Sequence, residues 1–230
     1  MSHPQKRRAS PARSPAPRSI HLEPALVEEL RATARPGKAD ILIQVFAEAA
    51  GAFAAGNYRE AARLAEQSKH IALRAPSPRE LLGLAYYRMG RWQHAARELS
   101  AFRRISGTQD QNPVLADCYR ALGKPERAIE LCNEIDDRKV APEIAYEGHI
   151  VAASALADTG RIDKAIERIE ALNLRPEVAE PHHIRAWYVL GDLLERQGRF
   201  TQAREWFDAA AAADPDATDA SERAGRLRGR

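Results

Sequence analysis

The stretch WYVLGDLLERQGRFTQAREWFDAAAAADP, residues 187–215, decides the fold. Trp187, Leu190, Gly191 and Leu194 recur at the spacing of a single helix face. Gly198 then interrupts the pattern with a residue for which a positive φ angle costs little. A second helical pattern follows directly. Two helices joined by so short a turn must run antiparallel and share their apolar faces.

The second helix of this hairpin is short and ends clearly. Phe200, Ala203 and Phe207 lie on one of its faces, and Pro215 stops it. Ala203, together with Gly191 on the first helix, provides small residues where large ones would hold the two axes apart. The stretch therefore predicts a closely packed helical hairpin with bulky residues towards its ends.

The same hairpin pattern occurs five times along the chain. Its turn glycines are Gly56, Gly90, Gly123, Gly160 and Gly198, separated by 34, 33, 37 and 38 residues. An alanine follows each glycine at the same distance: Ala61, Ala95, Ala128, Ala165 and Ala203. A period near 34 with two helices per unit is typical of a solenoid.

At these positions the chain resembles the tetratricopeptide repeat family, whose pattern is W-x2-L-G-x2-Y followed by A-x3-F and P. The matching residues are Trp187, Leu190, Gly191, Leu82, Gly83, Tyr86, Tyr119, Phe207, Ala210 and Pro215. Unit four departs from the pattern at Ala153 and Leu156, and unit one departs at Ala49 and Ala52. The resemblance covers roughly residues 42–217 and implies an all-α, right-handed solenoid of antiparallel helix pairs.

The chain divides into three predicted parts. Residues 1–21 form a basic Pro/Ser/Arg-rich tail, which buries too little apolar surface to fold and is predicted to be disordered. Residues 218–230 form a short terminal helix and a second basic tail. Between them lies the solenoid, 22–217, with a capping helix at 22–34 and repeats at about 39–75, 76–109, 110–142, 143–179 and 184–217.

Composition points to the cytoplasm. No apolar run is long enough to span a membrane, and the N-terminus lacks the apolar segment of a secretory signal. The two cysteines do not suggest a disulfide framework. The acid-free, Arg-rich start also resembles an organellar transit peptide, an alternative that its prolines disfavour because they interrupt an amphipathic helix.

The net charge of +3 belongs to the tails. Residues 1–22 hold five basic residues and no acid, and residues 222–230 hold four basic residues and one acid. Residues 23–221 therefore hold 26 basic and 31 acidic residues, a net charge of −5. This division argues against a nucleic-acid-binding surface on the repeats.

No sequence motif indicates an enzyme. The chain has no P-loop, no dinucleotide fingerprint and no nucleophile elbow. His182 and His183 are predicted to lie in a linker after Pro181 without metal-ligand spacing. Cys118 and Cys132 fall where the family packs small apolar residues, which predicts buried, inert thiols. We expect no catalysis, no cofactor and no metal.

The resemblance implies a concave groove, lined by the first helix of each repeat, that holds a peptide or a partner helix. Helical phase at 100° per residue places the groove residues. The candidates are Phe46, Phe53, Glu80, Leu84, Tyr87, Arg88, Asp117, Arg120, Glu147, Ile150, Ser154, Arg185, Tyr188, Asp192 and Glu195. For Phe46 and Phe53 an alternative is open, since the helix at 22–34 could cover them.

The functional prediction is a non-enzymatic adaptor or scaffold that binds a protein or peptide partner in this groove. The alternative is a nucleic-acid- or ribosome-associated factor whose tails hold RNA or DNA without specificity. Its candidate residues are Lys6, Arg7, Arg8, Arg13 and Arg18. Weak homo-oligomerisation through the ends of the array is a further expectation, and no membrane association is predicted.

Overall fold

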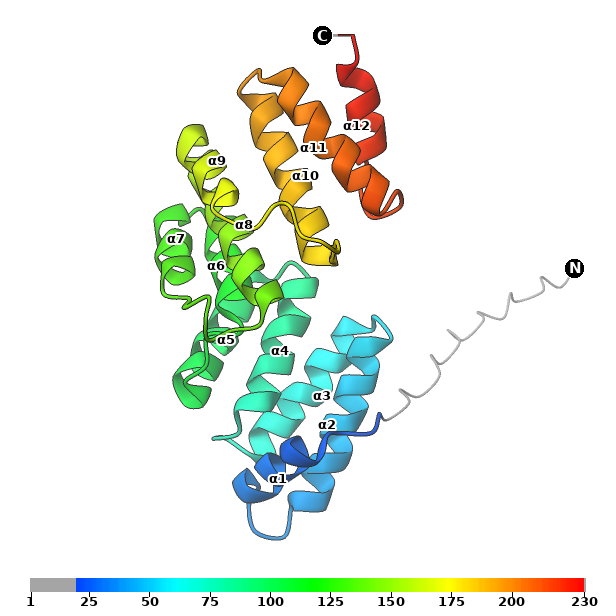
Figure 1. Ribbon diagram of the computed structural model, residues 1–230. Coiled ribbons are helices and arrows are strands. Elements are labelled where there is room, and N and C mark those ends of the chain that lie inside the picture. The colour runs from blue at the N-terminus through cyan, green and yellow to red at the C-terminus, as the bar shows by residue number, and fades with distance from the viewer. Residues whose placement is uncertain (1–19, 230) are drawn as a thin grey trace, which may run out of the picture.

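The computed structural model describes residues 20–229, which form twelve α-helices and no β-strand (Figure 1). The helices are α1 (Pro24–Thr33), α2 (Ala39–Ala54), α3 (Tyr58–Ile71), α4 (Pro76–Arg88), α5 (Trp92–Ser106), α6 (Asn112–Ala121), α7 (Pro125–Asn133), α8 (Pro142–Asp158), α9 (Ile162–Glu170), α10 (Pro181–Arg196), α11 (Phe200–Ala213) and α12 (Ala220–Leu227). The predicted all-α class is confirmed. Lys6, Arg7, Arg8, Arg13 and Arg18 lie outside the described residues.

Helices α2 to α11 form five consecutive hairpins, each packed on the next. The first helices also contact one another across repeats: α2 with α4, α4 with α6, α6 with α8, and α8 with α10. Figure 1 shows the array curved into an open C, with α5, α7 and α9 along its outer side. The first helices therefore line the inner side of the curve.

The turn between the two helices of each hairpin depends on its glycine. Gly56, Gly90, Gly123, Gly160 and Gly198 have φ angles between 69° and 83°. At the last of these turns, the Gly198 amide donates to Glu195 O at 3.0 Å and the Arg199 amide donates to Leu194 O at 2.9 Å. These bonds satisfy carbonyls at the end of α10, as expected for a helix that ends in a left-handed residue.

Two glycines inside the first helices permit close packing. A Cβ atom at Gly191 would lie 2.8 Å from the Phe207 ring, and one at Gly83 would lie 2.7 Å from the Leu99 side chain. Phe207 and Leu99 are both fully buried and cannot move aside. The prediction that small residues bring the paired axes together is confirmed at Gly191, and Gly83 makes the same close approach in the second repeat.

Helix α4 begins at Pro76, where the second repeat is predicted to start, with Pro78 buried in its first turn. Proline is tolerated there because the first amides of a helix have no partner. The start of α10 differs from the prediction. Helix α10 begins at Pro181, so the prediction that His182 and His183 lie in a linker is wrong. A capping box explains this early start: the Glu180 amide donates to His183 Nδ1 at 3.0 Å, and the Glu180 side chain accepts from the backbone of His183.

The N-terminal helix covers one of the predicted groove residues. Phe46 is 5% exposed and packs in one cluster with Leu22, Leu30 and Leu42. Its placement in the groove is therefore wrong, and the alternative of a capping helix holds for it. Glu29 ties α1 to the start of α4, because its carboxylate accepts from the Ser77 hydroxyl at 2.6 Å and from the Ser77 amide at 3.2 Å.

Candidate protein-interaction surface

The inner side of the array carries a row of polar side chains that bond to one another between first helices. Tyr87 on α4 donates its hydroxyl to Asp117 Oδ2 on α6 at 2.7 Å. Arg120 on α6 donates to Asp117 Oδ1 at 2.8 Å and to Asp158 Oδ2 on α8 at 2.9 Å. Burial and the neighbouring Asp117 raise the pKa of Tyr87 well above its usual value, so the hydroxyl stays a donor.

The row continues from α8 to α10. Arg185 pairs with the Glu147 carboxylate at 2.7 Å. Burial raises the pKa of Glu147, an effect that Arg185 opposes. Ile150, a further predicted groove residue on α8, is buried, whereas Ser154 is half-buried and donates to Ile150 O at 2.9 Å.

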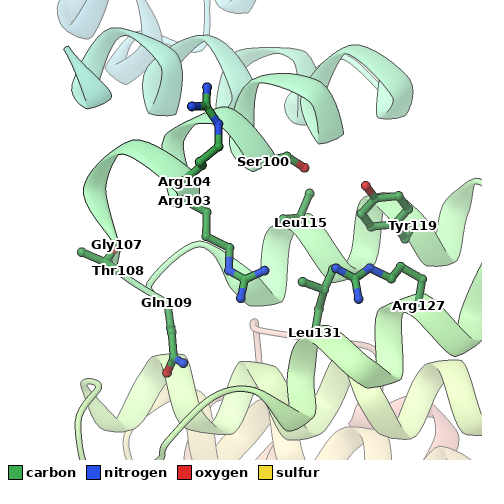
Figure 2. Close-up of a pocket in the computed structure, with 10 residues that line it drawn as sticks. All are labelled: Ser100, Arg103, Arg104, Gly107, Thr108, Gln109, Leu115, Tyr119, Arg127 and Leu131. Atoms are coloured by element: carbon green, nitrogen blue, oxygen red, sulfur yellow. The ribbon is translucent and has the colours of Figure 1, made fainter. Parts of the chain in front are cut away.

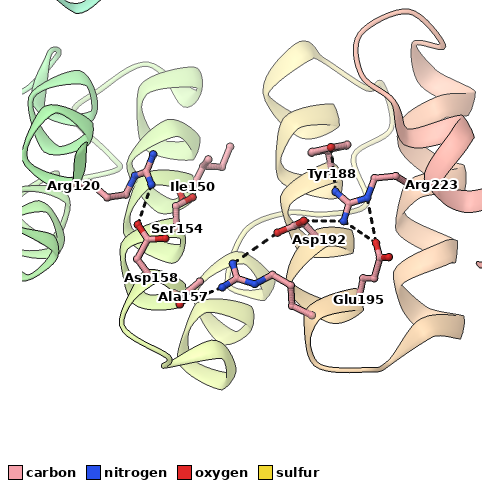
Figure 3. Close-up of polar contacts among 10 residues, drawn as sticks. Arg120, Ile150, Ser154, Ala157, Asp158, Tyr188, Asp192, Glu195 and Arg223 are labelled. Carbon is pink, nitrogen blue, oxygen red and sulfur yellow. Dashed lines mark hydrogen bonds and ion pairs between the residues drawn. The ribbon is translucent and has the colours of Figure 1, made fainter. Parts of the chain in front are cut away.

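At the C-terminal end, Arg223 of α12 binds three side chains of α10 (Figure 3). Its guanidinium donates to Tyr188 Oη at 3.1 Å, Asp192 Oδ1 at 2.8 Å and Glu195 Oε2 at 2.7 Å. Tyr188 in turn donates to Asp219 at 2.6 Å. The predicted groove residues Tyr188, Asp192 and Glu195 thus hold the terminal helix.

Sequence reasoning places Arg223 with the basic tail and misses this role. A usable signal is present, since Ala220, Ala224 and Leu227 form the buried face of α12. Arg223 directly precedes one of these residues, so helical phase puts it at the edge of the face that meets the array.

The N-terminal end of the surface is aromatic. Phe53 is half-buried and contacts the Tyr58 ring edge to face, with ring centroids 5.3 Å apart. Arg88 lies over the same Tyr58 ring and donates to its hydroxyl at 2.9 Å and 3.1 Å. Phe53, Tyr58 and Arg88 therefore form a cationic-aromatic corner. Unlike Phe46, Phe53 packs against a cluster of α2, α3 and α4 residues that includes none from α1.

The Glu80 carboxylate on α4 is bonded to an amide side chain. Glu80 accepts a hydrogen bond from Gln111 Nε2 at 2.8 Å, which links α4 to the start of α6. Burial raises the pKa of Glu80, and the nearby carboxylates of Asp110 and Glu29 raise it further. Carboxylates therefore gather where the start of α4 meets the start of α6.

Three groups of predicted groove residues are bonded or packed together. Tyr87, Asp117 and Arg120 form a contiguous central set. The α10 set bonds to α12, and the aromatic corner lies at the other end. These groups pair with one another. Burial raises the pKa of both Cys118 and Cys132 to about 12, which keeps the two thiols protonated. The prediction of buried thiols is confirmed.

Residues 20–229 carry neither a metal cluster nor a membrane-spanning helix. Within that range no group of three or more His, Cys, Asp or Glu side chains is placed to hold a metal ion. In the same part of the chain no helix combines the length and apolar character needed to cross a bilayer.

We expect stability to fall as the pH drops from about 7 to 5 because of His183. His183 is 7% exposed, and burial together with His182 lowers its pKa. Below the ordinary histidine pKa of about 6.5, the unfolded chain takes up a proton that folded His183 resists, so unfolding is favoured. A protonated Nδ1 would also lose the bond from the Glu180 amide.

The measurement is the urea midpoint as a function of pH, for the wild type and His183→Gln. His183→Gln should flatten the curve between about pH 7 and 5. An NMR titration that places the His183 pKa above about 6.5 would contradict this assignment.

Comparisons with known proteins agree with this architecture. Residues 150–218 match the family model described as tetratricopeptide repeat. A search of curated proteins gave no match. Among solved structures, TTC0263, a thermophilic TPR protein of Thermus thermophilus, superposes with a TM-score of 0.62 at 19% identity, covering 81% of this chain and 98% of that chain.

Two further structures are similar. A variant of the putative kinesin light chain TPR-like repeats from Podosopora anserina gives a TM-score of 0.63 at 20% identity, covering 82% of this chain and 100% of that chain. YrrB, described as a TPR protein with an unusual peptide-binding site, gives 0.55 at 18% identity, covering 82% and 92%. The protein is an α-solenoid of helix pairs. Residues 150–218 match the tetratricopeptide repeat family, and the array as a whole has the fold of solved TPR structures.

Proposed function

We propose that this chain is a non-enzymatic adaptor that binds an extended segment of a partner protein along the inner side of the array. The row of paired polar side chains from α4 to α12 supports this, because successive first helices offer donors and acceptors at regular intervals. Such a row suits a polar peptide, because its hydrogen-bonding groups can replace one member of each existing side-chain pair. The peptide-binding description of YrrB points in the same direction.

The proposed placement of the segment rests on two parts of this surface. The aromatic corner of Phe53, Tyr58 and Arg88 suits an apolar or aromatic anchor of the partner, since buried aromatics and arginines dominate binding energy at interfaces. Glu80 and Asp117 suit donors further along the segment. Free, buried thiols at Cys118 and Cys132 fit a reducing compartment, so we place this activity in the cytoplasm.

Site-specific photo-crosslinking tests the surface directly. A benzophenone amino acid is placed at Leu84, Ser154 or Arg185 on the inner side, and at Gln93 or Lys164 on second helices as controls. The proposal expects one partner to be captured from all three inner positions and not from the controls. Capture from second-helix positions alone would overturn it.

Charge reversal should then weaken capture of that partner. We expect Arg88→Glu combined with Arg185→Glu to reduce the affinity about tenfold or more, because both side chains are accessible on the inner side. The matched control is Arg59→Glu, an exposed arginine at the start of α3. If the double variant and the control bound the partner with equal affinity, the inner surface would not be the binding site. A variant that lacks residues 1–19 tests separately whether the tail contributes to binding.

A further inference from the structure

A cavity of about 390 Å³ opens on the outer side of the array, between α5, α6 and α7. It lies away from the inner surface, since α5 and α7 are second helices. Its polar lining consists chiefly of Ser100, Arg103, Arg104, Thr108, Tyr119 and Arg127 (Figure 2). The volume is within the range of small-ligand sites.

Two guanidiniums meet inside this cavity. Figure 2 shows Arg103 and Arg127 directed towards one another across Leu131, whereas Arg104 points away from them. Arg103 Nη2 pairs with Glu134 Oε2, and Arg127 Nη1 lies 3.9 Å from Glu134 Oε1 and 2.8 Å from Glu130 Oε2. The carboxylate of Glu134 therefore stands between the two arginines as an internal anion.

Three guanidiniums line the cavity. The two that face each other, Arg103 and Arg127, are paired with the carboxylates of Glu134 and Glu130. The Glu134 side chain is 37% exposed and follows the last residue of α7, so it can turn out into water without breaking that helix. An anion with more charge than a carboxylate could therefore take its place.

We propose that this cavity binds a phosphate group, which replaces Glu134 between Arg103 and Arg127. A carboxylate ligand would replace the Glu134 monoanion by another monoanion, with no gain in charge. A phosphate dianion carries more charge and offers oxygens in several directions, which suits two guanidiniums together with the hydroxyls of Ser100, Thr108 and Tyr119. The phosphate is free in solution or is carried on a side chain of a partner.

The test uses the full-length chain at fixed ionic strength and pH, with inorganic phosphate and a capped Ala-phosphoserine-Ala peptide as probes. The Nε–Hε NMR signals of Arg103 and Arg127 should shift saturably with each probe. If the phosphoserine peptide binds more tightly than inorganic phosphate, the natural ligand is a phosphorylated side chain of a partner. If the two probes bind equally, the ligand is the free anion. Absence of a saturable shift with both probes would overturn the proposal.

Variants separate this site from general charge attraction. Arg103→Gln and Arg127→Gln should each weaken binding about tenfold or more, because each removes a charge-assisted pair. Glu134→Gln should strengthen binding, since the competing carboxylate is gone. Arg226→Gln, an exposed arginine on α12, is the matched control. Equal weakening in Arg226→Gln, or unchanged binding in Glu134→Gln, would contradict the site, and circular dichroism checks that every variant keeps its helices.

Discussion

Replacing Glu98 by alanine is expected to cost about 3–5 kcal/mol of unfolding free energy. Glu98 is 2% exposed, and three cations surround its carboxylate. Lys69 on α3 lies 3.2 Å away, Arg79 on α4 lies 3.1 Å away, and Arg97 lies 3.0 Å away. Removing the one carboxylate leaves these cations close together, with Lys69 buried and without its interhelical partner.

The loss should be local as well as large. A solenoid is stabilised by each repeat and by its interfaces with its neighbours, so an ion cluster that joins α3, α4 and α5 couples the first two repeats. Hydrogen exchange should therefore show α3 and α5 losing protection before α10 and α11 do. Urea unfolding of the full-length chain gives the total cost.

Two controls make this result interpretable. Glu98→Gln keeps a hydrogen-bond acceptor and removes the charge, so its cost should be intermediate. Glu130→Ala breaks an exposed pair with Arg127 and should cost no more than about 1 kcal/mol. If Glu98→Ala were as mild as Glu130→Ala, the cluster would not contribute to the coupling of the first two repeats.

Phe207→Ala is expected to cost about 3–5 kcal/mol and to loosen the C-terminal end of the array. The Phe207 ring is 0% exposed and fills the space above Gly191. Its centroid lies 4.4 Å from the Arg223 guanidinium carbon and 5.6 Å from the Tyr188 ring centroid. Its removal leaves a cavity and also withdraws the surface on which Arg223 of α12 rests.

Substitution of Gly191 tests the same contact from the opposite side. Gly191→Ala alone should cost about 1–3 kcal/mol, because its Cβ would meet the ring at 2.8 Å. In a Phe207→Leu background the cost of Gly191→Ala should shrink, since the obstructing ring is absent. Phe53→Ala, at a half-buried ring, is the control and should be milder than Phe207→Ala. Equal costs for the two alanine variants, or strict additivity in the double variant, would contradict this account.

Helical phase predicts much of the candidate surface. A rotation of about 100° per residue assigns Glu80, Tyr87, Asp117 and Arg120 to one face, and the structure places them in contact between first helices or at their ends. Their use in partner binding stays a prediction. Phase alone does not show that α1 covers Phe46, because that depends on where a separate helix settles on α2.

The same distinction applies to residues that sequence reasoning misses. His183 belongs to α10 because a capping box extends that helix back to Pro181, and the box requires the side-chain directions of two residues. Arg223 contacts α10 because α12 packs beside α11 at one particular angle. Glu98 looks like any surface acid in sequence, and only the approach of α3 and α4 buries it.

The sequence by itself determined the repeat period, the positions of the turn glycines, the small residues at close helix approaches and the faces on which side chains lie. All of these follow from local geometry, since the period of a helix and the freedom of glycine act within a few residues. Only the tertiary structure decided which side chains meet across repeats, which residues the terminal helices cover and where the outer cavity forms. Those features depend on the angle between successive hairpins, which packing sets over the whole array and no short segment encodes.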